Sequence, residues 1–344
     1  MDTKIFKTEI EGRELSVELG RLAQQTNGSA LVTYGQTTVL ATAVMNSNAS
    51  DKNYLPLTVD YEERYYAAGK IKGSRFIKRE GRPRDEATIS ARLIDHAVRP
   101  LFPKDFMDEV QVIVTVLSVC NEADPEPLSL MAASAALHAS NIPWLGPTAT
   151  VRIGGKIKEG TNEVSEYVLN PQNGERDEAE FDLVLTGSKD AIVAMEGSFH
   201  NVKEESFLKA LEFGHKNIKT LVAFIDEFAK EVGSKKYVYE PHTLPKEIVA
   251  DVTKFIGKEI EKMATTPMDR LDRVDVYRDI LAKIEVEFEG KYKKTDMHRA
   301  FDEIEKGVVR DLILEKGKRP DGRKFDEVRP LSIEVGVLPR VHGS

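Results

Sequence analysis

Seven cations lie in one short, glycine-rich stretch of the chain, Gly69–Arg84, which contains a single acid, Glu80. Phe76 lies among these cations, and glycines allow the backbone to turn tightly and approach a partner. Ammonium and guanidinium groups bind phosphates, and an aromatic ring offers a face on which a base can stack. The pattern therefore favours single-stranded nucleic acid; the alternative is a solvated loop whose phenylalanine packs into the core. The cations are Lys70, Lys72, Arg75, Lys78, Arg79, Arg82 and Arg84.

Two further arginines follow this basic stretch, Arg92 and Arg99, seven residues apart on one face of an expected helix. Asp95 is spaced to pair with either arginine, at i+3 or i+4. Both a phosphate contact and a structural ion network are consistent with this spacing.

Motifs of several enzyme classes are missing from the sequence. It has no GxSxG, no Gly-Lys-Ser/Thr phosphate loop and no HExxH, so hydrolase, nucleotide triphosphatase and zincin chemistry have no support. Cys120 is the only cysteine, which excludes an internal disulfide, and we expect it to be a buried thiol in a reducing compartment. His96 and His138 lie on otherwise apolar helices, where structural roles are expected.

The bulk charge limits the kind of partner. The chain of 344 residues has 49 Lys and Arg against 57 Asp and Glu, a net charge of -8. A protein that coats nucleic acid would be basic, so phosphate binding must depend on a local patch. No signal peptide and no apolar run of about 18 residues is present. We expect a cytoplasmic protein with no membrane partner.

Hydrophobic periodicity predicts a mixed, α+β fold. Alternating segments indicate strands, and segments of period 3.6 indicate helices that bracket a buried strand. The expected strands are 14–45 (with turns), 56–66, 109–119, 148–157, 166–172 and 181–188, and the expected helices are 86–102 and 128–140.

From about residue 206 the period becomes helical throughout, with a proline-containing joint at 237–245. Three charged, amphipathic segments after the joint predict a small helical domain. A turn-rich linker, 316–330, follows, and then Leu331–Gly336 (LSIEVG) repeats the pattern of Leu15–Gly20 (LSVELG). We interpret this as the start of a second copy of the first fold; the alternative is a chance match between two strands.

Four stretches resemble polynucleotide phosphorylase over the whole chain. They are YEERYYAAGKIKGSRFIKREGRP, ARLIDHAVRPLFP, EVQVIVTVLSV, and RPDGR with RPLSIEVGVLPRVHGS. The resemblance implies an RNase PH-like core of mixed sheets with packed helices in residues 1–210, followed by a small all-α domain in 211–315. Residues 316–344 would be a linker and the truncated beginning of a second RNase PH-like core, with KH and OB-fold domains beyond it.

The family degrades RNA from the 3′ end with inorganic phosphate as co-substrate, releases nucleoside diphosphates in a reversible reaction, and requires Mg²⁺. The resemblance thus implies single-stranded RNA as partner, a homotrimeric ring, and a role in mRNA degradation that could include a complex with an endoribonuclease or helicase. It also implies that the basic stretch grips RNA through Phe76, Lys78, Arg79 and Arg82. Arg75, Arg92 and Arg99 are further candidates, and Arg75 is one residue more than the family pattern has.

The family's active site and its Mg²⁺ belong to the second core. At the matching positions of the first core stand Asp85, Glu86 and Ser90, Ser129 alone, and Asp182 with Arg176 six residues before it. We therefore expect no metal site, no confident catalytic residue and no activity from this span alone, with Asp182 structural. Arg319, Asp321 and Arg323 are candidates for supporting the active site. A non-catalytic RNA-binding ring scaffold is the main alternative, and a single-core enzyme of the RNase PH type is a weaker one.

Overall fold

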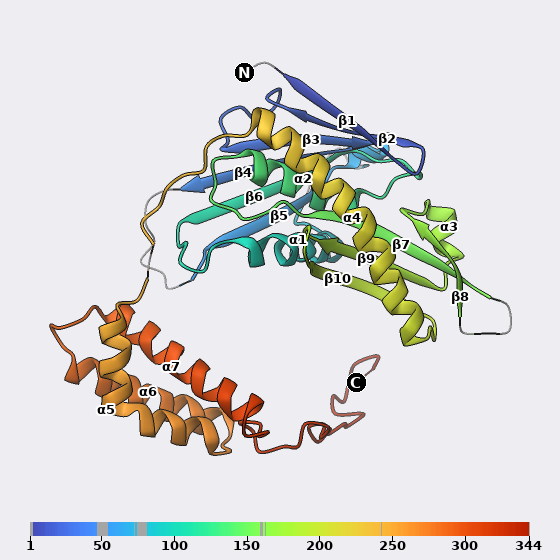
Figure 1. The fold of residues 1–344 in the computed structure, drawn as a ribbon. Helices are drawn as coiled ribbons and strands as arrows, with labels where there is room; N and C mark the ends of the chain where they lie inside the picture. The colour runs from blue at the N-terminus through green and yellow to red at the C-terminus, as the bar shows by residue number, and fades with distance from the viewer. Residues whose placement is uncertain are drawn as a thin grey trace. The chain divides into compact units, whose positions relative to one another are not determined.

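The computed structural model of the protein describes residues 3–46, 54–71, 73, 81–158, 161, 163–241 and 243–343. They form two compact units, which divide after residue 242. The first unit holds the strands that the structure describes, and the second holds the last three helices (Figure 1). The predicted α+β core followed by a helical region is confirmed.

The first sheet has six strands in the order β1-β2-β3-β4-β6-β5. Neighbouring strands are antiparallel, except that β5 lies parallel beside β6. Successive side chains of a strand point to opposite faces, and β2 accordingly buries Leu15, Val17 and Leu19. The strands are β1 (Lys4–Ile10), β2 (Arg13–Leu19), β3 (Gly28–Tyr34), β4 (Thr37–Asn46), β5 (Leu57–Glu63) and β6 (Glu109–Ser118).

The second sheet has four antiparallel strands in the order β10-β9-β7-β8. Its two central strands, β7 and β9, are buried almost throughout, whereas β10 is an exposed edge. The strands are β7 (Ala149–Ile157), β8 (Val164–Leu169), β9 (Phe181–Gly187) and β10 (Ile192–Phe199).

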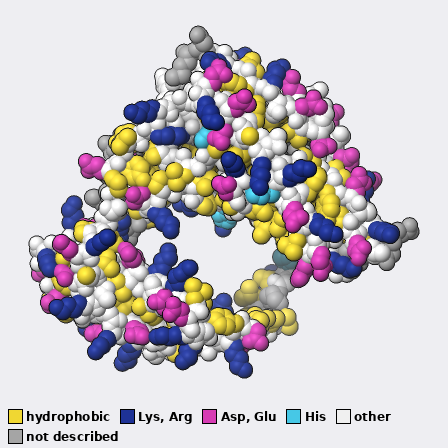
Figure 2. Space-filling model, viewed as in Figure 1, with side chains coloured by type: hydrophobic (Ala, Val, Ile, Leu, Met, Phe, Trp, Pro, Cys, Tyr) yellow, Lys and Arg dark blue, Asp and Glu magenta, His cyan; other side chains and the backbone are white. Residues whose placement is uncertain are grey.

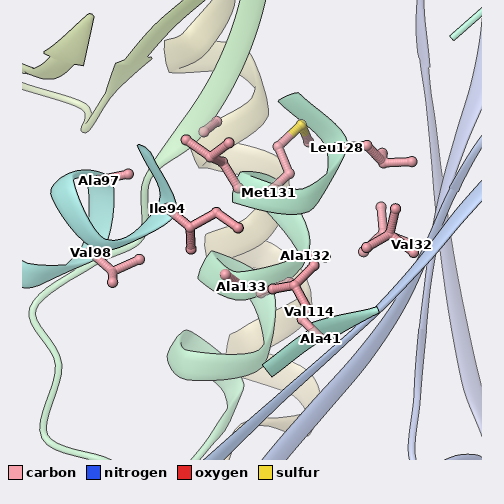
Figure 3. Packing of buried hydrophobic residues seen from close by; sticks show 14 of the residues in the cluster. Val32, Ala41, Ile94, Ala97, Val98, Val114, Leu128, Met131, Ala132 and Ala133 are labelled. Atoms are coloured by element: carbon pink, nitrogen blue, oxygen red, sulfur yellow. The ribbon is translucent and has the colours of Figure 1, made fainter. Parts of the chain in front are cut away.

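Two helices connect the sheets: α1 (Asp85–Val98) contacts β5 and β10, and α2 (Pro125–Ala139) contacts β3, β4 and β7. Figure 3 shows α2 in this position, with Val32 and Ala41 of the first sheet on one side and Ile94 of α1 on the other. Its many alanines allow close packing. A Cβ atom at Gly28 would collide with the carbonyl oxygen of Ala136, so β3 needs a glycine where it crosses α2.

The long helix α4 (Glu204–Val232) belongs to the first unit. It buries an apolar stripe that includes Ile218 and Ile225, and it contacts α2, β7, β8 and β9. The expected start of the helical domain at residue 211 falls inside α4, whereas the compact units divide after residue 242. The physical reason is that this stripe completes the core of the sheets.

The second unit is built on α5 (Lys246–Thr265), α6 (Arg270–Glu287) and α7 (Lys294–Leu314). Their buried faces meet in a separate core that includes Ile260, Ile284 and Phe301. Within the described ranges, no helix is long and apolar enough to cross a membrane.

The repeated segment has opposite surroundings in its two copies. Leu15 and Val17 of the first copy are each 1% exposed, whereas Leu331 and Ile333 are 82% and 84% exposed. Both copies end on a glycine with positive φ, +85° at Gly20 and +69° at Gly336. Residues 315–343 are all described, and none of them is in a strand. The second copy thus has the pattern of β2 but no partner strand in this stretch.

Three local predictions are wrong. Strand 56–66 ends at Glu63, and Tyr65 and Tyr66 lie in a 3₁₀-helix, η1 (Tyr65–Ala68). The strands β1 and β10 were not predicted, because edge strands with solvated faces show little apolar alternation. Cys120 is half-buried rather than buried, and its Sγ lies 3.4 Å from Thr37 Oγ1.

Candidate nucleic-acid interface

Most of the predicted RNA-gripping residues cannot be placed. Phe76, Lys78 and Arg79, together with Arg75, lie outside the residues that the structure describes. Arg82 is described and exposed, just before α1. It therefore fixes where one end of the basic stretch meets the first unit.

Arg82 lines a cavity of about 660 Å³. The walls come from the end of β5, from η1, from residues 81–84 and from the first turn of α1. Four cations and two acids line it, an excess of two positive charges in a chain whose net charge is -8. A locally positive cleft on an acidic protein is the arrangement that attracts a polyanion to one place. The charged residues are Glu62, Glu63, Arg64, Lys70, Arg82 and Arg84.

Neighbouring acids partly neutralise these cations. Arg84 Nη2 donates to Glu63 Oε2 at 2.7 Å, and Arg64 pairs with Glu62. The side chains of Lys70 and Arg82 make no hydrogen bond or ion pair with a described residue, and both are exposed. These two cations are consequently available to phosphates.

Two tyrosines beside the cations add aromatic surface. Tyr65 lines the cavity and is 47% exposed, and the adjacent Tyr66 is 58% exposed. Exposed rings among cations stack on the bases of single strands, each worth roughly 1–3 kcal/mol. The sequence analysis missed both as site residues because it placed them in a strand. The available signal was their position directly before a glycine-rich basic segment.

The remaining candidate arginines lie elsewhere: Arg92 is on α1, and Arg99 directly follows α1 in a 3₁₀-helix, η2 (Arg99–Leu101). Arg99 binds Asp95 through two nitrogens, at 2.6 and 2.8 Å, and also donates to the carbonyls of Leu55 and Leu57. This bonding selects the Arg99–Asp95 pair and gives Arg99 a structural role. Arg92 is exposed and has no side-chain partner among the described residues. Neither lines the cavity at Arg82.

On the face shown in Figure 2, Lys and Arg side chains are interspersed with Asp and Glu. Mixed charges of this kind produce little net attraction beyond a Debye length of about 8 Å at physiological salt. The cavity, with its excess of two cations, is therefore a candidate for a local phosphate-binding patch.

The sequence analysis considered the carboxylate of Asp182 for catalysis. One oxygen of this carboxylate accepts hydrogen bonds from two arginines. Its Oδ2 accepts from Arg152 Nη1 at 2.6 Å and from Arg176 Nε at 2.7 Å. The same two arginines bind Asp124, at 3.1 and 2.8 Å, and Arg152 also binds Glu126. Burial raises the pKa of Glu126, although Arg152 opposes the shift. The result is an ion network, defined by these five residues, at the start of α2.

This ion network does not fit a magnesium site. Mg²⁺ needs several oxygen ligands in octahedral geometry, whereas here guanidinium groups occupy the carboxylates. The described residues contain no group of three His, Cys, Asp or Glu side chains that could hold a metal ion.

Comparison with known proteins extends the observations to the whole chain. Models of the 3′ exoribonuclease family match residues 11–143 with domain 1 and residues 146–217 with domain 2. The chain belongs to the 3′ exoribonuclease family. The model of the polyribonucleotide nucleotidyltransferase RNA-binding domain matches residues 247–324, most of the second unit.

Curated relatives align with the whole chain. The polyribonucleotide nucleotidyltransferase of Caldicellulosiruptor saccharolyticus is 43% identical over 350 residues, which cover 100% of this chain and 48% of the relative. That of Halothermothrix orenii is 41% identical over 352 residues, covering 99% and 49%. The chain thus spans about half the length of the curated relatives it matches, and the resemblance to polynucleotide phosphorylase is confirmed. The crystal structure of rice (Oryza sativa) Rrp46 is 15% identical with a TM-score of 0.47, over 67% of this chain and 94% of that one.

Arg319, Asp321 and Arg323, the candidates for supporting an active site, lie close together in the linker of the second unit. Asp321 Oδ2 accepts from Arg319 at 2.8 Å and from Arg323 at 2.6 Å. The backbone N–H of Arg323 and these guanidinium groups lower the pKa of Asp321 to about 2. The cluster orders the linker; its support of an active site stays a prediction.

Proposed function

We propose that the chain is part of a polyribonucleotide nucleotidyltransferase, a phosphate-dependent 3′-to-5′ exoribonuclease that releases nucleoside diphosphates. The observation that carries the proposal is the order of the three matched domains along residues 11–324. The cavity with Lys70, Arg82 and Tyr65 supports RNA binding by the first unit.

We assign RNA binding and ring assembly to this span, and catalysis with Mg²⁺ to a second core. In phosphorolysis a phosphate attacks a phosphodiester, so cations and a metal must offset the charge that develops in the transition state. The ion network has two arginines, but three carboxylates already use them. It therefore offers an incoming phosphate no free cation.

The test compares the 344-residue chain with a full-length relative in one assay of radiolabelled RNA with inorganic phosphate and Mg²⁺. We expect the chain to bind RNA, with affinity that falls as salt rises, and to release no nucleoside diphosphate, whereas the full-length relative releases it. Robust release by the chain alone would contradict the assignment of catalysis to a second core. Binding unchanged between low and high salt would contradict the electrostatic grip.

The resemblance also supports a homotrimeric ring in the cytoplasm and association with an RNA-degradation complex. Sedimentation of the full-length protein would test the trimer. A non-catalytic ring scaffold is the second candidate, supported by the two arginines that bind the three carboxylates of the ion network. It predicts that the full-length protein binds RNA but does not phosphorolyse it.

A further inference from the structure

A second cavity, of about 480 Å³, lies where α2 begins and where α3 (Asn173–Asp177) connects β8 with β9. Its size lies within the range of small-molecule sites, about 300–1,000 Å³. Its functional side chains are Lys70, Cys120, Asn121, Asp124, Asn173 and Arg176.

The two cavities are neighbours. Both are lined by Ala68, Lys70, Val119 and Pro125. A single-stranded RNA bound beside Arg82 can therefore continue past Lys70 into the second cavity. A phosphate at Lys70 would be shared by the two.

Two amides give the second cavity its hydrogen-bonding character. The backbone N–H of Asn173 donates to the carbonyl of Asn121 at 3.2 Å, which fixes the two residues side by side. Both side chains are exposed, and neither makes a hydrogen bond to a described residue. Each free amide offers donors and an acceptor, the groups that read base edges and ribose hydroxyls of single-stranded RNA.

The single carboxylate of the wall does not repel a nucleotide strongly. Asp124 is bound by Arg176 at 2.8 Å and by Arg152 at 3.1 Å, so its charge is compensated within the ion network. Lys70 has no such partner among the described residues. The wall therefore presents one free cation and two free amides.

We propose that the second cavity is a ribonucleotide subsite, in which Asn121 and Asn173 bind the base or ribose and Lys70 binds the adjoining phosphate. The proposal rests on the proposed RNA-binding function and adds a position beyond the basic stretch. A nucleotide within an RNA chain and a free nucleoside diphosphate share this chemistry. The continuity with the cavity at Arg82 favours a nucleotide within an RNA chain.

The chain contains its own probe for this cavity. Cys120 is the only cysteine, it is half-buried, and it lines the second cavity. The experiment measures the rate of alkylation of Cys120 by N-ethylmaleimide, with and without oligo(A), while fluorescence anisotropy records RNA binding. At an oligo(A) concentration about ten times the dissociation constant, we expect alkylation to be about tenfold slower.

The matched variant, Asn121→Ala with Asn173→Ala, removes two exposed side chains that have no described partner. It should still bind oligo(A) through the basic stretch, but alkylation of Cys120 should no longer be slowed. Far-UV circular dichroism checks that the variant is folded. Lys189→Ala, in the exposed turn between β9 and β10, should keep both binding and protection.

The outcomes separate the two proposals. Oligo(A) that binds without slowing alkylation would overturn the subsite and leave the RNA-binding proposal intact. Absence of binding would overturn the RNA-binding proposal and the subsite with it. Protection by free ADP equal to that by oligo(A) would show a site for nucleoside diphosphates and overturn the assignment to an RNA chain.

Discussion

Arg152 Nη1 lies 2.6 Å from Asp182 Oδ2, across the two central strands of the second sheet, and the Arg152 side chain is 3% exposed. Replacing Arg152 with Met leaves three carboxylates without their central cation. Breaking a buried pair in this way costs about 3–5 kcal/mol. We expect that loss in the free energy of unfolding, measured by urea denaturation.

Arg176 provides the matched control for this substitution, because it binds two of the same carboxylates but is 36% exposed. Arg176→Met should cost clearly less than Arg152→Met. Equal losses would mean that burial of the guanidinium does not decide its contribution.

Lys236 should make stability depend on pH. Its ammonium donates to the carbonyls of Leu137, His138 and Ser140 at the end of α2, and burial lowers its pKa to about 8. Since its unfolded pKa is about 10.4, the unfolded chain binds more protons between these values, and stability should rise with pH there.

Lys236→Met tests this dependence. The variant loses the three hydrogen bonds and should be less stable at neutral pH. The stability difference between the wild-type chain and the variant should grow from pH 8 to pH 10. A constant difference over this interval would refute the role of Lys236 titration.

The basic stretch should dominate the salt dependence of RNA binding. Replacing Lys78 and Arg79 together with Ala removes two phosphate contacts, which should lower the slope of log affinity against log salt by about 1.4. Arg92→Ala should change it less. Titrations of labelled oligo(A) at several salt concentrations measure the slope, and equal effects of the two variants would mean that the basic stretch has no special role.

The two units should unfold separately. Phe301 is fully buried in the second unit, and Phe301→Ala should cost about 3–5 kcal/mol there. Trp144, the only tryptophan, is buried in the first unit, where its Nε1 donates to the carbonyl of Val98 at 2.8 Å. The variant should shift the helical circular dichroism transition but not the Trp144 fluorescence transition. A common shift would indicate a single cooperative unit.

Periodicity predicted the long elements well, because β6, α2 and α4 carry clear patterns of period 2 or 3.6. It could not predict the ion network. Arg152 and Asp182 are 30 residues apart, and only the pairing of β7 with β9 brings them together. The sequence placed Arg176 where the family has one of two aspartates. It did not indicate that Arg176 binds Asp182, the aspartate that remains.

The candidate site was predicted only in part. The excess of cations identified the region of Arg82, and the spacing of Asp95 correctly included Arg99 as a partner. The amides Asn121 and Asn173 carry no sequence signal, since asparagine is common in turns. Their proximity follows from one backbone hydrogen bond between the turn at Asn121 and the first residue of α3.

The enclosure of α2 has an evolutionary consequence. Ala132, Ala133 and Ala136 are fully buried on α2, which contacts the first sheet, α1 and the second sheet. Each therefore accepts only side chains of similar volume. Both sheets pack against α2. We therefore expect them to be inherited together, because recombination that exchanged either sheet for that of a distant homologue would leave one side of the helix mismatched.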